Sequence, residues 1–295
     1  MAETALPDIS DTARWVAVYR ALESERKDAL FRDPFASRLA GQRGRDIAET
    51  IWSSVRRNSW PLVVRTLLID QLVMKSIAEG ADLVLNLAAG LDARPYRLPL
   101  PPTLTWVEVD LPAILEEKER ALASETPVCN LRREAVDLSS SLLRNAFLER
   151  ALQGARRALV VTEGLLVYLE PKEARALAAD LALQSAISWW MVDIASPAIL
   201  QMMQRQTGPR LGPSAQMKFG PPEGVRFFEP LGWKPLEIRS LFREAARVKR
   251  LPGLLQLLSW LPDADPNNPG KRPWSAVVRY GRAAASSLPV AANTP

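Results

Sequence analysis

The chain has 295 residues, of which 47% are hydrophobic and 24% are charged, a composition that excludes a disordered or fibrous protein. Its net charge is +5, and its basic residues occur in separated pairs. Aromatic and basic residues do not alternate in one segment, as they do in many nucleic-acid-binding surfaces. The chain contains one cysteine, Cys129, and no histidine, which excludes an internal disulfide and removes the commonest general base and metal ligand.

No apolar run reaches the length of a membrane span, and the first ten residues lack the basic and apolar pattern of a secretion signal. We therefore expect a cytoplasmic protein that binds neither a membrane nor nucleic acid. No cluster of ligand-type side chains predicts a metal site. The basic charge fits an anionic small molecule as partner, and the sequence predicts no particular oligomeric state.

The first eighty residues have the pattern of helices. Residues 15–22 repeat apolar side chains at i, i+3, i+4 and i+7 behind several candidate N-caps. Asp33 followed by Pro34 predicts a second helix start, with the proline in the first turn. A third helix should open at Pro61 and end near Gly80.

After residue 80 the pattern changes to short strands. Seven runs rich in β-forming residues follow, at 82–88, 104–110, 130–138, 158–164, 188–195, 233–241 and 274–281. The first five alternate with helical segments, such as 113–124 and the helix that Pro171 opens. This alternation predicts an α/β protein with a mostly parallel sheet, in which ligands bind beyond the carboxyl ends of the strands.

We expect a single domain over residues 1–281. Its parts are a helical cap (1–80), a core (81–195), a lid-like insertion rich in methionine and proline (196–224) and C-terminal strands (225–281), followed by a disordered tail (282–295).

The loop after the first strand, in "DLVLNLAAGLDARPYRL" (82–98), contains a single glycine, Gly90, and early prolines at 95 and 99. A pyrophosphate site needs several free backbone N–H groups and an aligned helix N-terminus. This loop is a poor pyrophosphate site, but it can admit a compact uncharged or zwitterionic group. The alternative is a plain turn between strand and helix.

Asp110 lies 20 residues after Gly90, at the end of the second strand, where a carboxylate can accept both hydroxyls of a ribose. Glu108 projects to the same side of that strand. The alternative for Asp110 is an N-cap before Pro112. A ribose-binding acid beside a poor phosphate loop suggests a nucleoside ligand without phosphates, such as S-adenosylmethionine.

Two further acids follow strands. Asp137 and Leu138 could meet the amine and the ring of adenine, or Asp137 could cap the next helix. Glu163 ends the fourth strand within an apolar run, so it needs a ligand or a partner, and a buried ion pair with an arginine is the alternative.

The chain resembles the leucine carboxyl methyltransferase family of class I S-adenosylmethionine-dependent methyltransferases, in its bacterial small-molecule branch. The resemblance runs from Thr12 to Gly164 and, more weakly, to Tyr280. It is carried by the order and spacing of "TARWVAVYRALES", "LFRDPFASRLAG", "NLAAGLDARPYRL", "WVEVDLP" and "VTEGLLVYLEP". It implies a Rossmann-like fold with a mostly parallel seven-stranded sheet flanked by helices, and S-adenosylmethionine as cofactor.

The resemblance also implies which residues bind that cofactor. They are Ala89 and Gly90 for the methionine part, Glu163 for its amino group, Arg65 for its carboxylate, Asp110 for the ribose, and Asp137 with Leu138 for the adenine.

On the acceptor side, the resemblance places Arg20 near the site of methyl transfer and Tyr168 beside the substrate. The family usually has a second glycine where Ala88 stands. Arg94 and Arg97 also match the family pattern, and we interpret them as structural partners of nearby carboxylates rather than catalytic groups.

Because the chain has no histidine, its chemistry must proceed without an imidazole base. A carboxylate acceptor is already ionised at neutral pH, whereas a phenol must lose a proton. We therefore expect O-methylation of a small molecule, with a carboxylate favoured and a phenol second. The competing hypotheses are an RNA methyltransferase, a nicotinamide-dependent enzyme and a binding protein without activity.

Overall fold

The computed structural model describes residues 9–50, 59–208, 212 and 215–282. The predicted disordered tail begins at Arg282, which is the last residue of a strand, and otherwise lies outside the described residues. Within the described residues, none of the helices combines the length and the apolar character that a membrane span requires.

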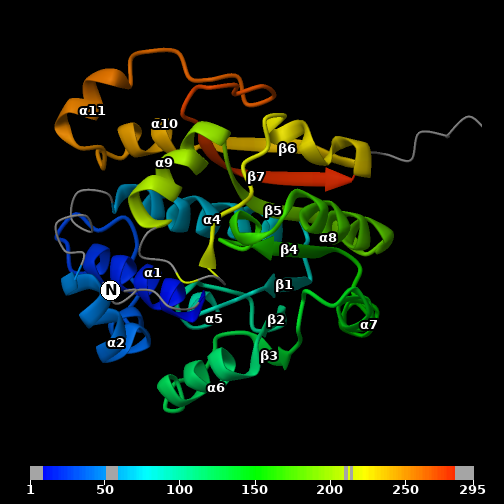
Figure 1. Ribbon diagram of the computed structural model, residues 1–295. Coiled ribbons are helices and arrows are strands. Elements are labelled where there is room, and N and C mark those ends of the chain that lie inside the picture. Colours follow the sequence, from blue (N-terminus) through cyan, green and yellow to red (C-terminus); the bar gives the residue numbers. More distant parts are fainter. Residues whose placement is uncertain (1–8, 51–58, 209–211, 213–214, 283–295) are drawn as a thin grey trace, which may run out of the picture.

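A seven-stranded sheet crosses the molecule in the order β3-β2-β1-β4-β5-β7-β6 (Figure 1). Strands β1 to β5 are parallel, and β7 is antiparallel to both of its neighbours. The predicted mostly parallel α/β sheet is confirmed. The strands are β1 Leu83–Leu87, β2 Thr105–Asp110, β3 Asn130–Ala135, β4 Ala158–Thr162, β5 Ile187–Ala195, β6 Trp233–Ser240 and β7 Ser275–Arg282.

Helices cover both faces of the sheet. They are α1 Ile9–Ser24, α2 Ala36–Thr50, α4 Trp60–Ala78, α5 Arg94–Arg97, α6 Pro112–Ala121, α7 Ser141–Ala151, α8 Pro171–Leu183, α9 Pro197–Thr207, α10 Leu241–Arg247 and α11 Gly253–Leu258, with 3₁₀ turns η1 Leu166–Tyr168 and η4 Gly224–Leu231. Proline occupies the first turn of α4, α5, α6, α8 and α9, where its fixed φ favours a helix and its missing N–H costs nothing.

The central strands are buried on both sides, which explains their continuous apolar sequences. All five residues of β1 and all five of β4 are buried. Along β1, Leu83, Leu85 and Leu87 pack on the face covered by α7, α8 and η4, while Val84 packs on the face covered by α4 and α10. This alternation fixes the register of the strand, because a shift by one residue would exchange the two faces.

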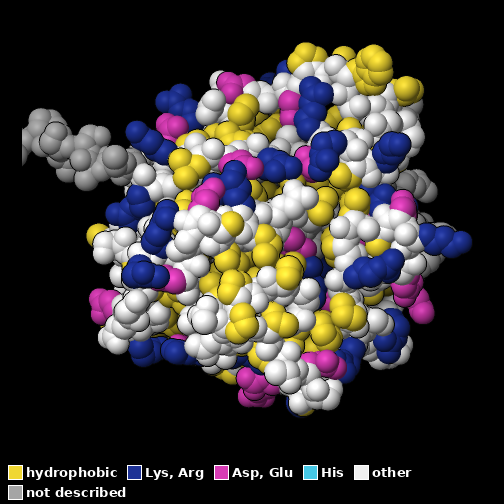
Figure 2. Space-filling model, turned by 180° about the vertical axis from the view of Figure 1, so that it is seen from behind, with side chains coloured by type: hydrophobic (Ala, Val, Ile, Leu, Met, Phe, Trp, Pro, Cys, Tyr) yellow, Lys and Arg dark blue, Asp and Glu magenta, His cyan; other side chains and the backbone are white. Residues whose placement is uncertain are grey.

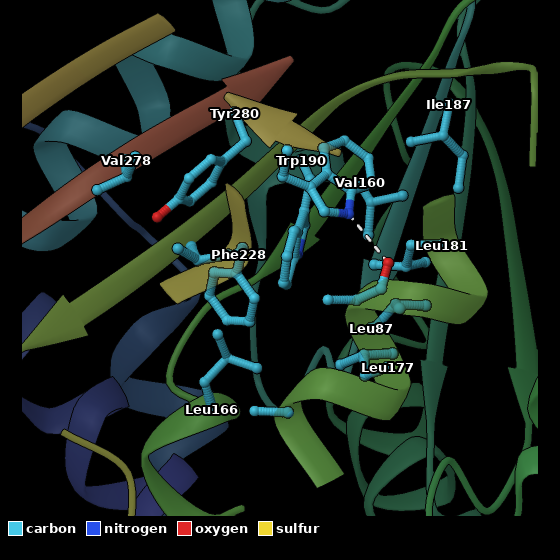
Figure 3. Close-up of a cluster of buried hydrophobic side chains, with 14 of the residues drawn as sticks. Leu87, Val160, Leu166, Leu177, Leu181, Ile187, Trp190, Phe228, Val278 and Tyr280 are labelled. Carbon is cyan, nitrogen blue, oxygen red and sulfur yellow. Dashed lines mark hydrogen bonds between the residues drawn. The ribbon is translucent and has the colours of Figure 1, made fainter. Parts of the chain in front are cut away.

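Trp190 of β5 is the centre of the larger apolar cluster (Figure 3). Its ring lies with its centroid 4.7 Å from that of Phe228 and 5.4 Å from that of Trp233. The indole Nε1 donates a hydrogen bond of 3.0 Å to Thr162 Oγ1, so its one polar atom is satisfied inside the core. The packing joins β4, β5 and η4 into a rigid base for the strand ends.

Candidate active site

A cavity of about 730 Å³ lies at the carboxyl ends of β1, β4 and β5, within the usual size of a small-molecule site. In the sheet, β1 lies between β2 and β4, so the strand order reverses direction at β1. Such a topological switch point is where α/β sheets bind ligands. Helices α1, α4, α9 and α11 supply other walls. Of the residues predicted for the site, the lining includes Arg20, Arg65, Ala89, Gly90, Asp110, Glu163 and Tyr168.

The loop after β1 is held by Asp110. The Gly90 N–H donates a 2.6 Å hydrogen bond to one carboxylate oxygen of Asp110, and the Leu111 N–H donates a 2.8 Å bond to the other. Ala88 and Gly90 have φ values of 55° and 49°, a region that favours glycine. The helix that follows this loop, α5, has only four residues, so it is not the long helix that a pyrophosphate site uses.

Asp110 therefore lines the cavity and also fastens the loop. Burial raises the pKa of its carboxyl group, and the two backbone N–H groups oppose that rise. The alternative that it caps α6 is wrong, because Leu111 is the N-cap residue of α6 and provides no side-chain cap.

Glu163 lies between two arginines at the end of β4. Its Oε1 accepts a 3.0 Å hydrogen bond from Arg65 Nε, and its Oε2 accepts a 2.8 Å bond from Arg94. Burial alone would raise the pKa of Glu163, but Arg94 and Arg65 outweigh it and hold the pKa below its ordinary value. The ion pair considered as an alternative for Glu163 is thus present, and it lies in the wall of the cavity.

Asp193 of β5 completes this group and was missed by sequence reasoning. It accepts a 3.0 Å hydrogen bond from Arg65 Nη1 and a 2.7 Å bond from the Gly164 N–H. Gly164 has a φ of 66°, and a Cβ there would lie 3.4 Å from the Arg65 guanidinium. The only signal in the sequence was a single acid near the end of the apolar run "SWWMVDIA".

The alternating charges continue from Glu163 through Arg94 and Asp92, which line the cavity, to Asp70 and Arg97, which are not among its described lining residues. Arg94 donates to Asp70 at 2.6 Å and to Asp92 at 2.9 Å, and Arg97 donates to Asp70 at 2.7 Å. The prediction that Arg94 and Arg97 pair with nearby carboxylates is confirmed. We call these groups, together with Glu163, Arg65 and Asp193, the ion network.

Glu108 has a different role from its neighbour Asp110. It is fully buried and accepts hydrogen bonds of 2.6 Å from Lys118 and 2.8 Å from Arg133, so it joins β2 to α6 and β3. It is not among the described residues that line the cavity.

Asp137 and Leu138 are also outside the described lining. Asp137 is exposed and accepts hydrogen bonds from the Ser139 N–H and hydroxyl, at 2.9 and 2.7 Å. The alternative that Asp137 caps the next helix is wrong, because Ser140 caps α7. The adenine role of Asp137 and Leu138 stays a prediction.

Arg20 and Tyr168 face the cavity with their polar groups partly engaged. Arg20 donates from Nε to Asp33 at 2.8 Å and from Nη2 to the Leu91 carbonyl at 2.6 Å. Among the described residues, none accepts a hydrogen bond from its Nη1. Burial raises the pKa of Tyr168, so its hydroxyl stays protonated at neutral pH.

Known proteins resemble the chain in sequence and in fold. Residues 13–182 match the family described as "Leucine carboxyl methyltransferase". A Streptomyces coelicolor protein named "Putative S-adenosyl-L-methionine-dependent methyltransferase" is 34% identical over 242 residues, covering 76% of this chain and 82% of that protein. A Mycobacterium tuberculosis protein with a name of the same kind is 33% identical over 214 residues, covering 66% and 60%.

Two solved structures have the same fold. The first, described as "a putative methyltransferase" from Thermobifida fusca, has a TM-score of 0.59 and 18% identity, covering 95% of this chain and 96% of that one. The second, a DUF574 family protein from Streptomyces avermitilis, has a TM-score of 0.56 and 15% identity, with 92% and 97% covered.

Proposed function

The chain belongs to the leucine carboxyl methyltransferase family, and we propose that it uses S-adenosylmethionine to methylate an oxygen atom of a small acidic molecule. Its membership and its relatives support methyl transfer from S-adenosylmethionine in general. The residues of this chain favour oxygen as the acceptor atom, and a carboxylate over a phenol.

The residues at the strand ends fit S-adenosylmethionine. Arg65 and Glu163 put opposite charges side by side in the cavity wall, which matches the zwitterionic methionine part. The Gly90 loop allows close approach of the ligand to the backbone. Both carboxylate oxygens of Asp110 accept hydrogen bonds from backbone N–H groups, and each keeps a lone pair that can accept a hydrogen bond from a ribose hydroxyl.

Leu111 and Ile114 line the cavity next to Asp110 in the sequence and offer an apolar surface to the adenine ring. They join Asp137 and Leu138 as candidates for that contact. Bound S-adenosylmethionine supplies a methyl group on a positively charged sulfur, so this chain's residues need only position the acceptor and exclude water.

The absence of histidine from the whole chain carries the preference for a carboxylate. A carboxylate acceptor has a pKa of about 4 to 5 and needs no base. Its oxygen forms the new O–CH₃ bond while the electrons of the C–S bond remain on sulfur, and no proton moves. A phenol would need a base. Of the acids that line the cavity, Glu163 and Asp193 are paired with Arg65, and Asp92 is paired with Arg94. Tyr168 is itself a neutral phenol.

Arg20 is the candidate that holds the acceptor carboxylate. Its guanidinium is buried and fixed by Asp33, which leaves Nη1 to donate to an anion in the cavity. A fixed cation at this place would orient one acceptor oxygen toward the methyl group.

A panel of compounds with one shared ring tests the proposal: benzoate, phenol and benzylamine, together with a short RNA, incubated with methyl-labelled S-adenosylmethionine. We expect label in benzoate, and its release by alkali, since methyl esters are hydrolysed by alkali and methyl ethers are not. Transfer to phenol alone would contradict the carboxylate preference. Transfer only to benzylamine or RNA would contradict O-methylation of a small molecule.

A further inference from the structure

Part of the cavity lining is apolar, and we call this part the apolar end of the cavity. There its walls come from α9, the segment 215–219 and the α10–α11 region, which Figure 1 shows grouped on one side of the molecule. The side chains that matter here are Met202, Met203, Met217, Phe242, Leu258 and Leu261. The three methionines among these lining residues give an apolar surface that adapts to ligands of different shape.

This apolar end continues to the outer surface. Leu258 and Leu261 line the cavity, yet they are 46% and 58% exposed. Leu257 and Trp260 beside them are 71% and 89% exposed. Figure 2 shows hydrophobic side chains gathered at the top right of the molecule, the corner that α11 occupies. Contiguous exposed apolar side chains of this kind mark binding surfaces.

The backbone of this segment is fixed although its side chains are exposed. Arg243 donates hydrogen bonds of 2.5 and 2.7 Å to the carbonyls of Ser259 and Leu261. Arg272 donates a 3.1 Å bond to the carbonyl of Pro262. The apolar side chains are therefore presented in one arrangement at the edge of the cavity.

We propose that the acceptor carries an extended apolar body, such as an acyl chain, that lies along this end of the cavity and emerges between Leu258 and Leu261. Its acidic group would lie at the other end, near Arg20. The inference rests on the proposed function, because it takes the cavity to be the place where an acid is methylated. The continuity of lining and exposed surface at Leu258 and Leu261 is the observation that supports it.

Binding of straight-chain acids tests the inference. Calorimetry would compare butanoate, hexanoate and decanoate on the full chain in the presence of S-adenosylhomocysteine. Each added methylene that enters the cavity should tighten binding by about fourfold, the factor that follows from burying one CH₂ group.

The variants Leu258→Glu and Leu261→Glu should weaken decanoate binding by about tenfold or more, because they place a charge where the chain would lie. Leu257→Glu is the matched control, since Leu257 belongs to the same helix, is more exposed and is not among the described lining residues. It should leave decanoate binding unchanged. The thermal midpoint of each variant shows that it is folded.

Equal affinity for butanoate and decanoate would overturn the inference. So would an equal loss of binding in Leu257→Glu and Leu258→Glu, which would indicate a flat surface contact such as a lipid bilayer. Methyl transfer to the same straight-chain acids, and to benzoate, tests the proposed function separately. Absence of transfer to every one of these acids would remove the proposed function, whereas transfer with no dependence on chain length would remove only this inference.

Discussion

Ala88 adopts a backbone conformation that glycine adopts at lower cost, with a φ of 55° in the loop after β1. A residue with a Cβ pays about 1–2 kcal/mol in this region, while glycine loses about 0.4–1 kcal/mol through the entropy of the unfolded chain. We expect Ala88→Gly to raise the free energy of unfolding by about 0.5–1 kcal/mol, as measured by urea denaturation.

The control for this change is Ala89→Gly. Ala89 is not among the described residues with positive φ, so the same change should lower the free energy of unfolding. A loss of stability in Ala88→Gly as large as that in Ala89→Gly would show that the backbone at residue 88 is not under strain.

Asp110 is the residue whose removal should affect S-adenosylmethionine binding most directly. Asp110→Ala removes the acceptor for a ribose hydroxyl and the anchor of the Gly90 N–H. We expect binding to weaken by about 2–3 kcal/mol, the usual worth of a hydrogen bond to a charged group. Calorimetry with S-adenosylmethionine measures this change.

Asp137→Ala is the comparison, because Asp137 is exposed and binds Ser139. If the adenine lies in the described cavity, this variant should bind S-adenosylmethionine with the same affinity as the unaltered chain. A loss equal to that of Asp110→Ala would instead place Asp137 at the adenine, as the family resemblance implies.

Among the elements, the short helices α10 and α11 are fastened to α1 by one arginine. Arg250, between them, donates a 2.8 Å hydrogen bond to Glu23, whose side chain is 3% exposed. Arg250→Ala leaves a buried carboxylate without this partner, so the free energy of unfolding should fall by about 3 kcal/mol in a denaturation experiment.

Arg247→Ala provides the matched control on α10. Arg247 is 61% exposed, and its partner Glu244 also pairs with Arg239, so loss of this exposed cation should lower the free energy of unfolding by only about 0–1 kcal/mol. Similar losses in the two variants would show that the Arg250–Glu23 pair is no more important than a surface contact.

The elements differ in how far sequence predicts them. Buried parallel strands leave continuous apolar runs, and proline marks helix starts, so the seven strands and most of the longer helices were predicted. Helix α9 was not predicted, because its residues lie in the stretch that the sequence analysis interpreted as a lid-like insertion. The helices α10 and α11 have seven and six residues and η4 has eight, too few for a hydrophobic period to show. These short elements are the ones that border the apolar end of the cavity or pack beneath β5.

At the scale of the whole molecule, the ion network makes the free energy of unfolding depend on pH. The neighbouring arginines hold the pKa values of Asp92 and Glu163 below their ordinary range in the folded chain, against the effect of burial. The unfolded chain, with pKa values of about 4, therefore takes up more protons as the pH falls. The stability that these groups contribute above about pH 4 is lost below it.

We expect the free energy of unfolding to fall steeply below about pH 4, and the difference between the unaltered chain and Glu163→Gln to narrow there. Urea denaturation over a series of pH values measures both. Glu119→Gln, at a side chain that is 55% exposed, should show a small difference at every pH. A difference for Glu163→Gln that stayed constant with pH would contradict the assigned ion pairs.

Only some residues of the candidate site could be predicted from the sequence. Asp110 and Glu163 were found because acids at strand ends are visible in the sequence. Asp193 was missed because its partners, Gly164 and Arg65, are 29 and 128 residues away and meet it only in the folded sheet. The pairing of Glu108 with Lys118 and Arg133 was likewise not predicted, since the sequence alone does not show whether an acidic residue forms an ion pair in the folded chain.

The backbone anchoring of residues 259–262 has a consequence for how acceptor choice could change over evolution. Arg243 and Arg272 hold this segment through carbonyl groups, which every amino acid possesses. Side chains there can therefore be exchanged without releasing the segment from the protein. A new acceptor could therefore be accommodated by exchanges at this place without change at the strand ends where we propose that S-adenosylmethionine binds, and directed evolution of acceptor specificity would best begin with Leu258 and Leu261.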